Sequence, residues 1–531
     1  MDYDIIKQDS FSRKGIFLCL LLIGIIGLLV RLYFEPQIPF TGDAMHYFVY
    51  AVDTGLKGKL SDVYFLGNSG WSLLLSAFFS MTKYDDPLFL MELQRSLSIF
   101  ISVVTIIPVY FLCRRFFNQS YSLIGASLFL FQPHIIINST LGITEPIFLF
   151  LGISSLTLFL SNNHKIIYAS FAVAGLFTLI RFEGLLFFAM LSIMFFVKYR
   201  NEKRYFLRYP LVLAIYVLVL LPVAYSNFET HERDGFVSEL IDRNKASYMH
   251  YVQGIPDVGD PLYGSADSAN IQNFLANGIK NTVFFFGVAA IPIFIFLVPV
   301  GVVLIIKNRK NLKINFQIVT IVLVSLTMLI PAFYTYGRGS DDVRFLFMVF
   351  PLLVLISLYG ISKLKTKNHH FIMVGITAAI VLTSFLYLDF KNEIDVDYEN
   401  EVFLITKFIA SKTSLINDNS VDIRYRTAAT IVTNWPNLPT PTSESHVERS
   451  LKLISSAGHN SLIEFIDLSK DKGLTHLAVD GREHQPEFFK DVFYHDKEYD
   501  YLTKIFDSRD HGMNYHVKIF KIDYNKVKNY L

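Results

Sequence analysis

Charged residues are scarce in this chain of 531 residues: Asp, Glu, Lys and Arg make up 18% of it, against 52% hydrophobic residues. A soluble domain is about 25% charged on average, so soluble domains of this total length would have too little charge to cover their surfaces. Cysteine is scarcer still, with only Cys19 and Cys113, both in apolar runs. Two such residues exclude a disulfide-stapled scaffold and a cysteine-rich zinc module. The composition indicates a membrane protein, and the net charge of +2 gives no sign of nucleic-acid binding.

The shortage of charge belongs to one part of the sequence. Residues 1–390 contain 30 basic and 24 acidic residues, whereas the much shorter stretch 391–531 contains 18 and 22. We therefore predict a membrane domain over residues 1–390 and a water-soluble domain over residues 391–531.

The membrane domain contains apolar runs of the length that a bilayer-spanning helix needs, about 20 residues. The first run lacks a small-residue cleavage site, so we interpret it as an uncleaved anchor. No repeat of two related halves is visible, which disfavours the common transporter architectures. We expect about eleven transmembrane helices, at residues 14–34, 95–117, 119–138, 143–161, 165–181, 183–198, 207–226, 282–306, 314–334, 344–362 and 370–390.

Basic residues gather in alternate loops between these spans, which predicts that those loops are cytoplasmic. With eleven spans, the N-terminus is then cytoplasmic and the C-terminal domain extracytoplasmic. The basic residues are Lys7, Arg13, Lys14, Arg114, Arg115, Lys165, Lys198, Arg200, Lys203, Arg204, Arg208, Lys307, Arg309, Lys310, Lys313, Lys363, Lys365 and Lys367.

The remaining loops share the outer face, and two of them are long. Loop 35–94 contains two stretches, 42–60 and 67–79, that we expect to be helices lying along the membrane surface. Loop 227–280 is long enough to act as a lid. Charged groups at the ends of apolar spans are costly and are therefore functional hypotheses. On the outer face these are Asp43, Glu145, Arg181, Glu183, Arg338, Asp341, Asp342 and Arg344.

Each of these residues also has an ordinary structural explanation. Asp43 can cap the helix that follows it, and Glu145, followed by Pro146, can be a helix-start residue. Arg181 and Glu183 can form an ion pair within a tight turn between two spans.

The same holds for the later charges. Asp341 and Asp342 can be loop charges, and Arg344 can reach out to lipid phosphate from the end of its span. His46 lies one helical turn after Asp43, where it is either a metal ligand or a surface or packing histidine.

The order of these motifs resembles a known superfamily. Asp43 in GDAMHY follows the first span, a T-E-P motif contains Glu145, and an R-x-E-G turn starts at Arg181. Arg344 begins an R-F-x-x-x-x-x-P entry to a late span, and a soluble outer domain ends the chain. The sequence thereby resembles the C-type, multi-spanning glycosyltransferases, in particular their protein O-mannosyltransferase and aminoarabinose transferase branch.

The resemblance implies an α-helical polytopic membrane protein with a C-terminal extracytoplasmic α/β domain. It further implies a sugar donor on polyprenyl or dolichyl phosphate, an acceptor protein, glycan or lipid arriving from outside, and Asp43 as the catalytic base. Many members carry a second acidic residue beside that position, where this sequence has Ala44. The second acidic role would then fall to Asp53, Asp62, Glu92 or Glu145, and the need for a divalent metal stays open.

The chemistry of sugar transfer assigns roles to the charged residues. A carboxylate takes the proton of the attacking acceptor hydroxyl, and a single base acting in line implies inversion at the anomeric carbon. Arginine offers a permanent two-pronged contact to the leaving phosphate. The predicted phosphate-binding residues are Arg344, Arg338, Arg181 and Lys57. The predicted supporting, acceptor-binding or metal-binding residues are Glu145, Glu183, Asp341, Asp342, His46 and Asp53.

The C-terminal domain is predicted to be a small α/β domain that recognises the acceptor or packs over the site. We expect helices at 399–412 and 459–472, a strand at 475–479, and an edge or terminal strand at 515–522.

Two other functions fit the sequence. A transporter or flippase for lipid-linked sugars would need charges near the middle of the bilayer and internal symmetry. A membrane sensor or scaffold would use the outer domain to bind a ligand.

Overall fold

The computed structural model describes residues 12–62, 64–82, 86–201, 207–251, 271–308, 315–363, 369–392, 394–418, 421–435, 450–483 and 485–530. The chain divides into two compact units. The first unit contains residues 1–35, 59–75 and 94–392, and the second contains 36–58, 76–93 and 393–531. The second unit therefore includes two parts of the long first loop besides the predicted C-terminal domain.

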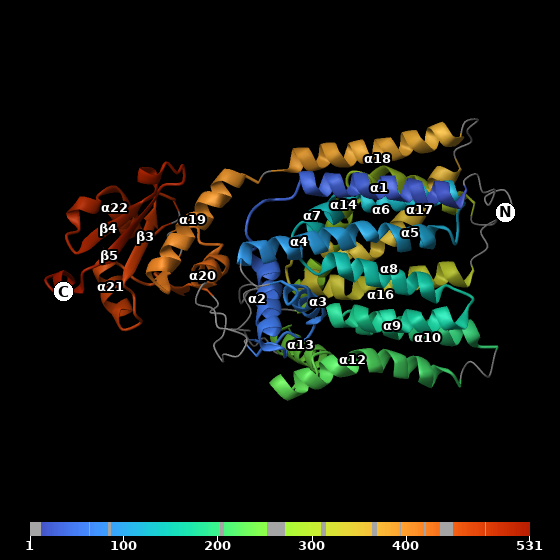
Figure 1. Cartoon of the computed structure of the whole chain (residues 1–531), viewed down its shortest axis with the longest axis horizontal. Coiled ribbons are helices and arrows are strands. Elements are labelled where there is room, and N and C mark those ends of the chain that lie inside the picture. Colours follow the sequence, from blue (N-terminus) through green and yellow to red (C-terminus); the bar gives the residue numbers. More distant parts are fainter. Residues whose placement is uncertain are drawn as a thin grey trace. The chain divides into compact units, whose positions relative to one another are not determined.

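Apolar helices occupy the position of every predicted span, and Figure 1 shows the long helices of the first unit running alongside one another. By length and composition six helices can cross a membrane, or up to eight if two bent pairs each count as one span. Three shorter apolar helices fill the remaining positions, so the number eleven stays a prediction. The helices are α1 (Arg13–Tyr33), α4 (Pro87–Val104), α5 (Ile106–Cys113), α6 (Gln119–Leu130), α7 (Pro133–Ser139), α8 (Glu145–Phe159), α9 (His164–Ile180), α10 (Gly184–Tyr199), α12 (Tyr209–His231), α14 (Ile271–Ala290), α15 (Phe294–Lys307), α16 (Phe316–Gly337), the 3₁₀ helix η3 (Val343–Val349), α17 (Phe350–Ser362) and α18 (His369–Lys391).

Polar residues fix where several of these helices begin. An asparagine side chain accepts a hydrogen bond from a backbone N–H in the first turn of three helices. These are Asn118 for α6, Asn163 for α9 and Asn315 for α16. Such caps satisfy donors that a helix cannot satisfy itself.

Arg31 is an unexpected polar element inside the first unit. Its side chain is fully buried, and it donates to the hydroxyls of Ser139 and Ser102 and to the carbonyls of Gly27 and Leu130. These four neutral acceptors join α1, α4, α6 and α7 at one point.

Both expected helices of the first loop are present. They are α2 (Gly42–Lys57) in the second unit and α3 (Gly70–Phe79). Loop 227–280 is largely helical where it is described, because α12 extends to His231 and α13 covers Val237–Tyr251. Residues 252–270 of this predicted lid lie outside the described residues, as do eight of the basic loop residues: Lys7, Lys203, Arg204, Arg309, Lys310, Lys313, Lys365 and Lys367.

The C-terminal part of the second unit is an α/β domain, as predicted. Strand β1 (Leu415–Asn417) pairs in parallel with β2 (Lys452–Ile454), and β3 (His476–Asp480), β5 (Val517–Ile522) and β4 (Leu502–Asp507) form an antiparallel sheet in that order. The helices are α19 (Val396–Lys412), α20 (Arg426–Asn434), α21 (Leu462–Lys470), α22 (Glu487–Tyr494) and the short α23 (Tyr524–Val527), with 3₁₀ turns at Asp496–Glu498 and Ser508–His511. The segment predicted as an edge or terminal strand, β5, is the last strand of the described chain but lies in the middle of its sheet, because β4 covers its other side.

The last residue of β3, Asp480, has a buried carboxylate. Asp480 is 1% exposed and accepts hydrogen bonds from Arg482, Gln485 and Tyr515. Burial raises the pKa of the Asp480 carboxyl although Tyr515 and Arg482 oppose that shift. The network ties the loop after β3 to the start of β5.

Candidate functional site

Glu145 is the first residue of α8 and lies almost fully inside the first unit, with 2% of it exposed. Pro146 in the first helical turn needs no backbone N–H partner. The carboxylate lies at the positive end of the helix dipole, and Thr144 donates a long hydrogen bond to it, 3.4 Å. Glu145 is thus a helix-start residue, as one interpretation had it, and its side chain is also held inside the protein.

Arg181 supplies the main partner of that carboxylate. It follows α9 in an extended conformation, and its Nη1 lies 2.8 Å from Glu145 Oε1. Its Nε and Nη2 donate to Glu183 Oε1 at 3.2 and 2.8 Å. The ion pair expected within the R-x-E-G turn is therefore present, and the same guanidinium also pairs with the T-E-P motif.

Arg344 approaches the cluster from the other side. It lies in η3, where its backbone N–H donates to Asp342 Oδ1 at 2.9 Å and its Nε forms an ion pair with Asp342 Oδ2 at 3.0 Å. Its Nη1 is 3.7 Å from Glu145 Oε1, which is an ion-pair distance rather than a hydrogen bond. Tyr336 donates to the Asp342 carbonyl at 2.9 Å and so holds the loop between α16 and η3.

The five charged side chains form one cluster, which we call the Glu145 cluster: Glu145, Arg181, Glu183, Asp342 and Arg344. Three carboxylates face two guanidiniums. Phe148 and Phe345 lie beside them, with the Arg181 guanidinium 5.4 and 5.8 Å from the ring centres.

The cluster leaves little empty space. The cavity among these side chains measures about 10 Å³, which is room for one water at most. A sugar phosphate can therefore enter only if side chains move.

The long first loop, residues 35–94, holds both turns of the cluster in place. Trp71 Nε1 and Gln94 Nε2 donate to the carbonyl of Gly142, just before the T-E-P motif, at 3.2 and 2.7 Å. Asn68 donates to the carbonyl of Ile180, immediately before Arg181, at 3.1 Å.

Gly70 permits this packing. A Cβ atom there would lie 2.7 Å from the carbonyl oxygen of Leu179. The sequence pattern predicted only a surface helix for this stretch, and its role in holding the cluster was missed. The signal available in the sequence was the stretch Gly-Asn-Ser-Gly-Trp at residues 67–71. A buried tryptophan there needs an acceptor for its indole N–H.

Of the other predicted site residues, four belong to the second unit and two to the first. Asp43 and His46 are exposed at the start of α2, and Asp53 pairs with Lys57 at 3.1 Å within the same helix. Arg338 ends α16 with its guanidinium 5.5 Å from the ring centre of Tyr334, and Asp341 is exposed.

A metal does not fit the donor set of the Glu145 cluster, because its carboxylates are committed to guanidiniums. Across the part of the chain that the structure describes, no group of three His, Cys, Asp or Glu side chains lies together as metal ligands would. We therefore assign no step to a metal.

Gly184 is required by the turn that positions Arg181. A Cβ atom at this residue would lie 2.5 Å from Thr178 Cα and 2.8 Å from Thr178 N. Gly184→Ala is therefore expected to displace the turn and to lower the melting temperature of the purified protein, in line with the cost of about 1–3 kcal/mol for overpacking. Gly375→Ala is the matched control, because a Cβ atom added at Gly375 would meet no atom within 4 Å apart from its chain neighbours and the nearby backbone of its own helix. Equal melting temperatures for the two variants would show that the turn is not under this constraint.

No protein-family model matches the chain, and no curated protein matches it in sequence. Solved structures do match. The oligosaccharyltransferase of Archaeoglobus fulgidus, in complex with Zn and sulfate, matches with a TM-score of 0.55 and 13% identity over 87% of this chain and 68% of its own. The same enzyme with an inhibitory peptide and a dolichol-phosphate matches with a TM-score of 0.51 and 14% identity, over 87% of this chain and 69% of its own.

A bacterial enzyme matches over almost its whole length. ArnT from Cupriavidus metallidurans bound to undecaprenyl phosphate has a TM-score of 0.52 and 9% identity, with 94% of this chain and 97% of ArnT covered. At such identities the likeness establishes the fold of the chain.

Proposed function

We propose that this chain, which has the fold of the C-type glycosyltransferases, is a membrane enzyme that transfers a sugar from a polyprenyl or dolichyl phosphate to an acceptor. The observation that carries the proposal is the Glu145 cluster, where two arginines from separate helices meet at the end of an apolar bundle. The neighbours support the donor class, because structures of them contain dolichol-phosphate or undecaprenyl phosphate.

Arg344 is the proposed ligand of the donor phosphate. Its distance of 3.7 Å to Glu145 is longer than a hydrogen bond, whereas Arg181 is held by three short contacts to Glu145 and Glu183. A phosphate can therefore displace the weaker Arg344–Glu145 contact at lower cost. Arg181 then neutralises Glu145 and fixes the site, and Glu183 keeps Arg181 in place.

Asp43 is the proposed base. A carboxylate accepts the proton of an acceptor hydroxyl as its oxygen attacks the anomeric carbon, and the phosphate leaves with the bonding electron pair. The phosphate is a good leaving group, so the chemistry needs a cation to hold it rather than an acid to protonate it. A single base acting in line leads to inversion.

The proposed orientation places the Glu145 cluster on the outer face. Within the first unit, one end of the helices carries Glu145, Arg181 and Arg344. The opposite ends of α9 and α10 carry Lys165 and Lys198. Under the rule that basic loops face the cytoplasm, the N-terminus is cytoplasmic and the C-terminal domain is extracytoplasmic, where acceptor recognition is its proposed task.

A transferase and a flippase give different products from the same starting mixture. The purified chain is reconstituted in vesicles with a panel of polyprenyl-phosphate sugars and with soluble glycan and peptide acceptors. The proposal predicts free polyprenyl phosphate together with a glycosylated acceptor. Movement of intact donor between leaflets with no free polyprenyl phosphate would favour the flippase instead.

Arg344→Gln is expected to raise the KM for the lipid-linked donor about tenfold or more, because a hydrogen bond to a charged group contributes about 1.5–3 kcal/mol. Donor titrations at fixed acceptor concentration measure this. Arg338→Gln is the matched control. It removes the same charge just after the last residue of α16, and it is expected to change the KM by about threefold at most. Equal increases in the two variants would contradict the choice of Arg344.

A further inference from the structure

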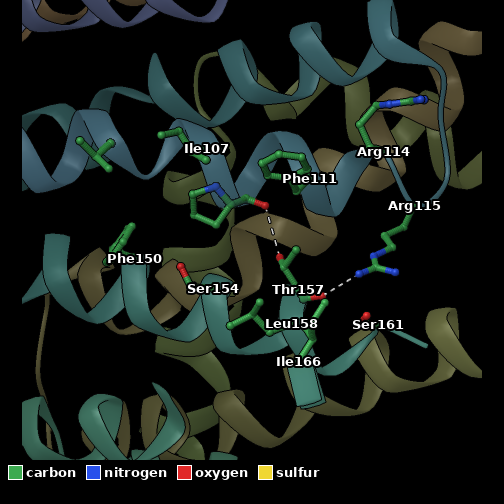
Figure 2. A pocket seen from close by; sticks show the side chains of 12 residues that line it. Ile107, Phe111, Arg114, Arg115, Phe150, Ser154, Thr157, Leu158, Ser161 and Ile166 are labelled. Atoms are coloured by element: carbon green, nitrogen blue, oxygen red, sulfur yellow. Dashed lines mark hydrogen bonds between the residues drawn. The ribbon is translucent and has the colours of Figure 1, made fainter. Parts of the chain in front are cut away.

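The first unit also contains a groove, which lies near the end of α8 opposite to Glu145. This groove of about 630 Å³ runs between α5 and α8, within the range of about 300–1,000 Å³ typical of small-molecule sites (Figure 2). Thr157 in its wall follows Glu145 by some three turns of α8, or about 18 Å. The groove is therefore separate from the Glu145 cluster.

Most of the groove is apolar and reaches the surface of the bundle. Ile107, Phe111 and Ile166 in its lining are 46%, 54% and 36% exposed. Ser154, Thr157 and Ser161 are the hydroxyl-bearing residues of the lining, and none of the lining residues is acidic. Such a wall suits a hydrocarbon chain rather than a water-soluble ligand.

One end of the groove carries positive charge. Arg115 points into it and donates from Nη2 to the Thr157 carbonyl at 3.1 Å, and Thr157 Oγ1 donates to the Pro108 carbonyl at 3.3 Å (Figure 2). Lys198 Nζ donates to the carbonyl of Ser161 at 2.5 Å, beside the same end. The Thr157 carbonyl takes one donor of the Arg115 guanidinium, whose fork carries further N–H donors.

An apolar groove with a cationic end is complementary to an amphiphile with an anionic head. We propose that the groove binds an acyl chain of an anionic phospholipid and that Arg115, with Arg114 beside it, holds the lipid phosphate. Basic pockets between transmembrane helices bind such head groups. The lipid belongs to the leaflet at the basic end of the bundle, so this site is distinct from the donor site and does not depend on the proposed transferase activity.

Equilibrium binding of fluorescent phosphatidylglycerol to the full-length protein in neutral detergent tests the site. Wild-type protein is expected to bind phosphatidylglycerol at least about tenfold more tightly than phosphatidylcholine. Arg115→Gln is expected to lower the affinity for phosphatidylglycerol about tenfold, in line with the loss of a charged hydrogen bond. Arg200→Gln, which removes an exposed arginine after α10, is the control and is expected to leave the affinity within about twofold.

Two further measurements test whether the apolar wall of the groove takes part in binding. Ser154→Phe fills the groove without changing any charge, and it is expected to lower the affinity about as much as Arg115→Gln does. Inorganic phosphate at millimolar concentration is expected not to displace the lipid, because it cannot use the apolar wall. Equal affinities for both lipids, equal effects of Arg115→Gln and Arg200→Gln, unchanged binding in Ser154→Phe, or displacement by phosphate would each overturn the proposal.

Discussion

Asp43→Asn is expected to lower the rate of sugar transfer by about 10²–10⁴-fold, which is the contribution that a positioned general base makes. The amide keeps the shape of the side chain but cannot take the proton of the acceptor hydroxyl. Because Asp43 is exposed at the start of α2, its replacement is expected to leave the melting temperature unchanged. The measurement is the initial rate at saturating donor and acceptor, with donor affinity determined separately.

His46→Gln is the matched control for this variant. It lies one helical turn further along α2 and is likewise exposed. We expect it to retain most of the rate. Full activity of Asp43→Asn would eliminate Asp43 as the base, and the acidic role would then have to be sought at Glu145 or Asp53.

Glu145→Ala is expected to have the largest effect on stability. Its carboxylate is 2% exposed and lies 2.8 Å from Arg181 and 3.7 Å from Arg344. Removing it takes away the carboxylate that the two guanidiniums share, while Glu183 still pairs with Arg181 and Asp342 with Arg344. Breaking a buried pair costs about 3–5 kcal/mol, and the remaining partners place the expected cost at the lower end of that range. We expect a large fall in the melting temperature of the purified protein and loss of transfer.

Asp342→Ala separates this effect from a general loss of charge. Asp342 also pairs with Arg344, but its side chain is 40% exposed, so water can replace it. The expected loss of stability is about 1 kcal/mol or less. A melting temperature for Glu145→Ala as high as that of Asp342→Ala would mean that Glu145 is not the centre of the cluster.

The apolar helices were predictable because hydropathy over some 20 residues is a local property of the sequence. All five members of the Glu145 cluster were also predicted as candidates, because a charge at the end of an apolar span is costly wherever it lies. Their pairing was only partly predictable. The Arg181–Glu183 pair lies within one turn, whereas the pairing of Arg181 with Glu145 depends on how α8 packs against α9.

The contacts that hold the cluster could not be read from the sequence. Asn68, Trp71 and Gln94 all bond to backbone carbonyls, and such acceptors exist at every residue, so they leave no pattern of residue types. The edge position, one of the two predicted for β5, is wrong for a related reason. Alternating burial identifies a strand, but it does not say how many neighbours the strand has.

We propose above all that the chain breaks the bond between a sugar and a lipid phosphate. The most direct measurement is the amount of polyprenyl phosphate that the purified full-length protein releases from a radiolabelled panel of polyprenyl- and dolichyl-phosphate sugars, with glycan, peptide and lipid acceptors present to take up the sugar. We predict release from at least one donor by the wild type, and release at least about a hundredfold slower by Asp43→Asn. Absence of release from every donor by correctly folded wild-type protein, or equal release by both proteins, would contradict the claim.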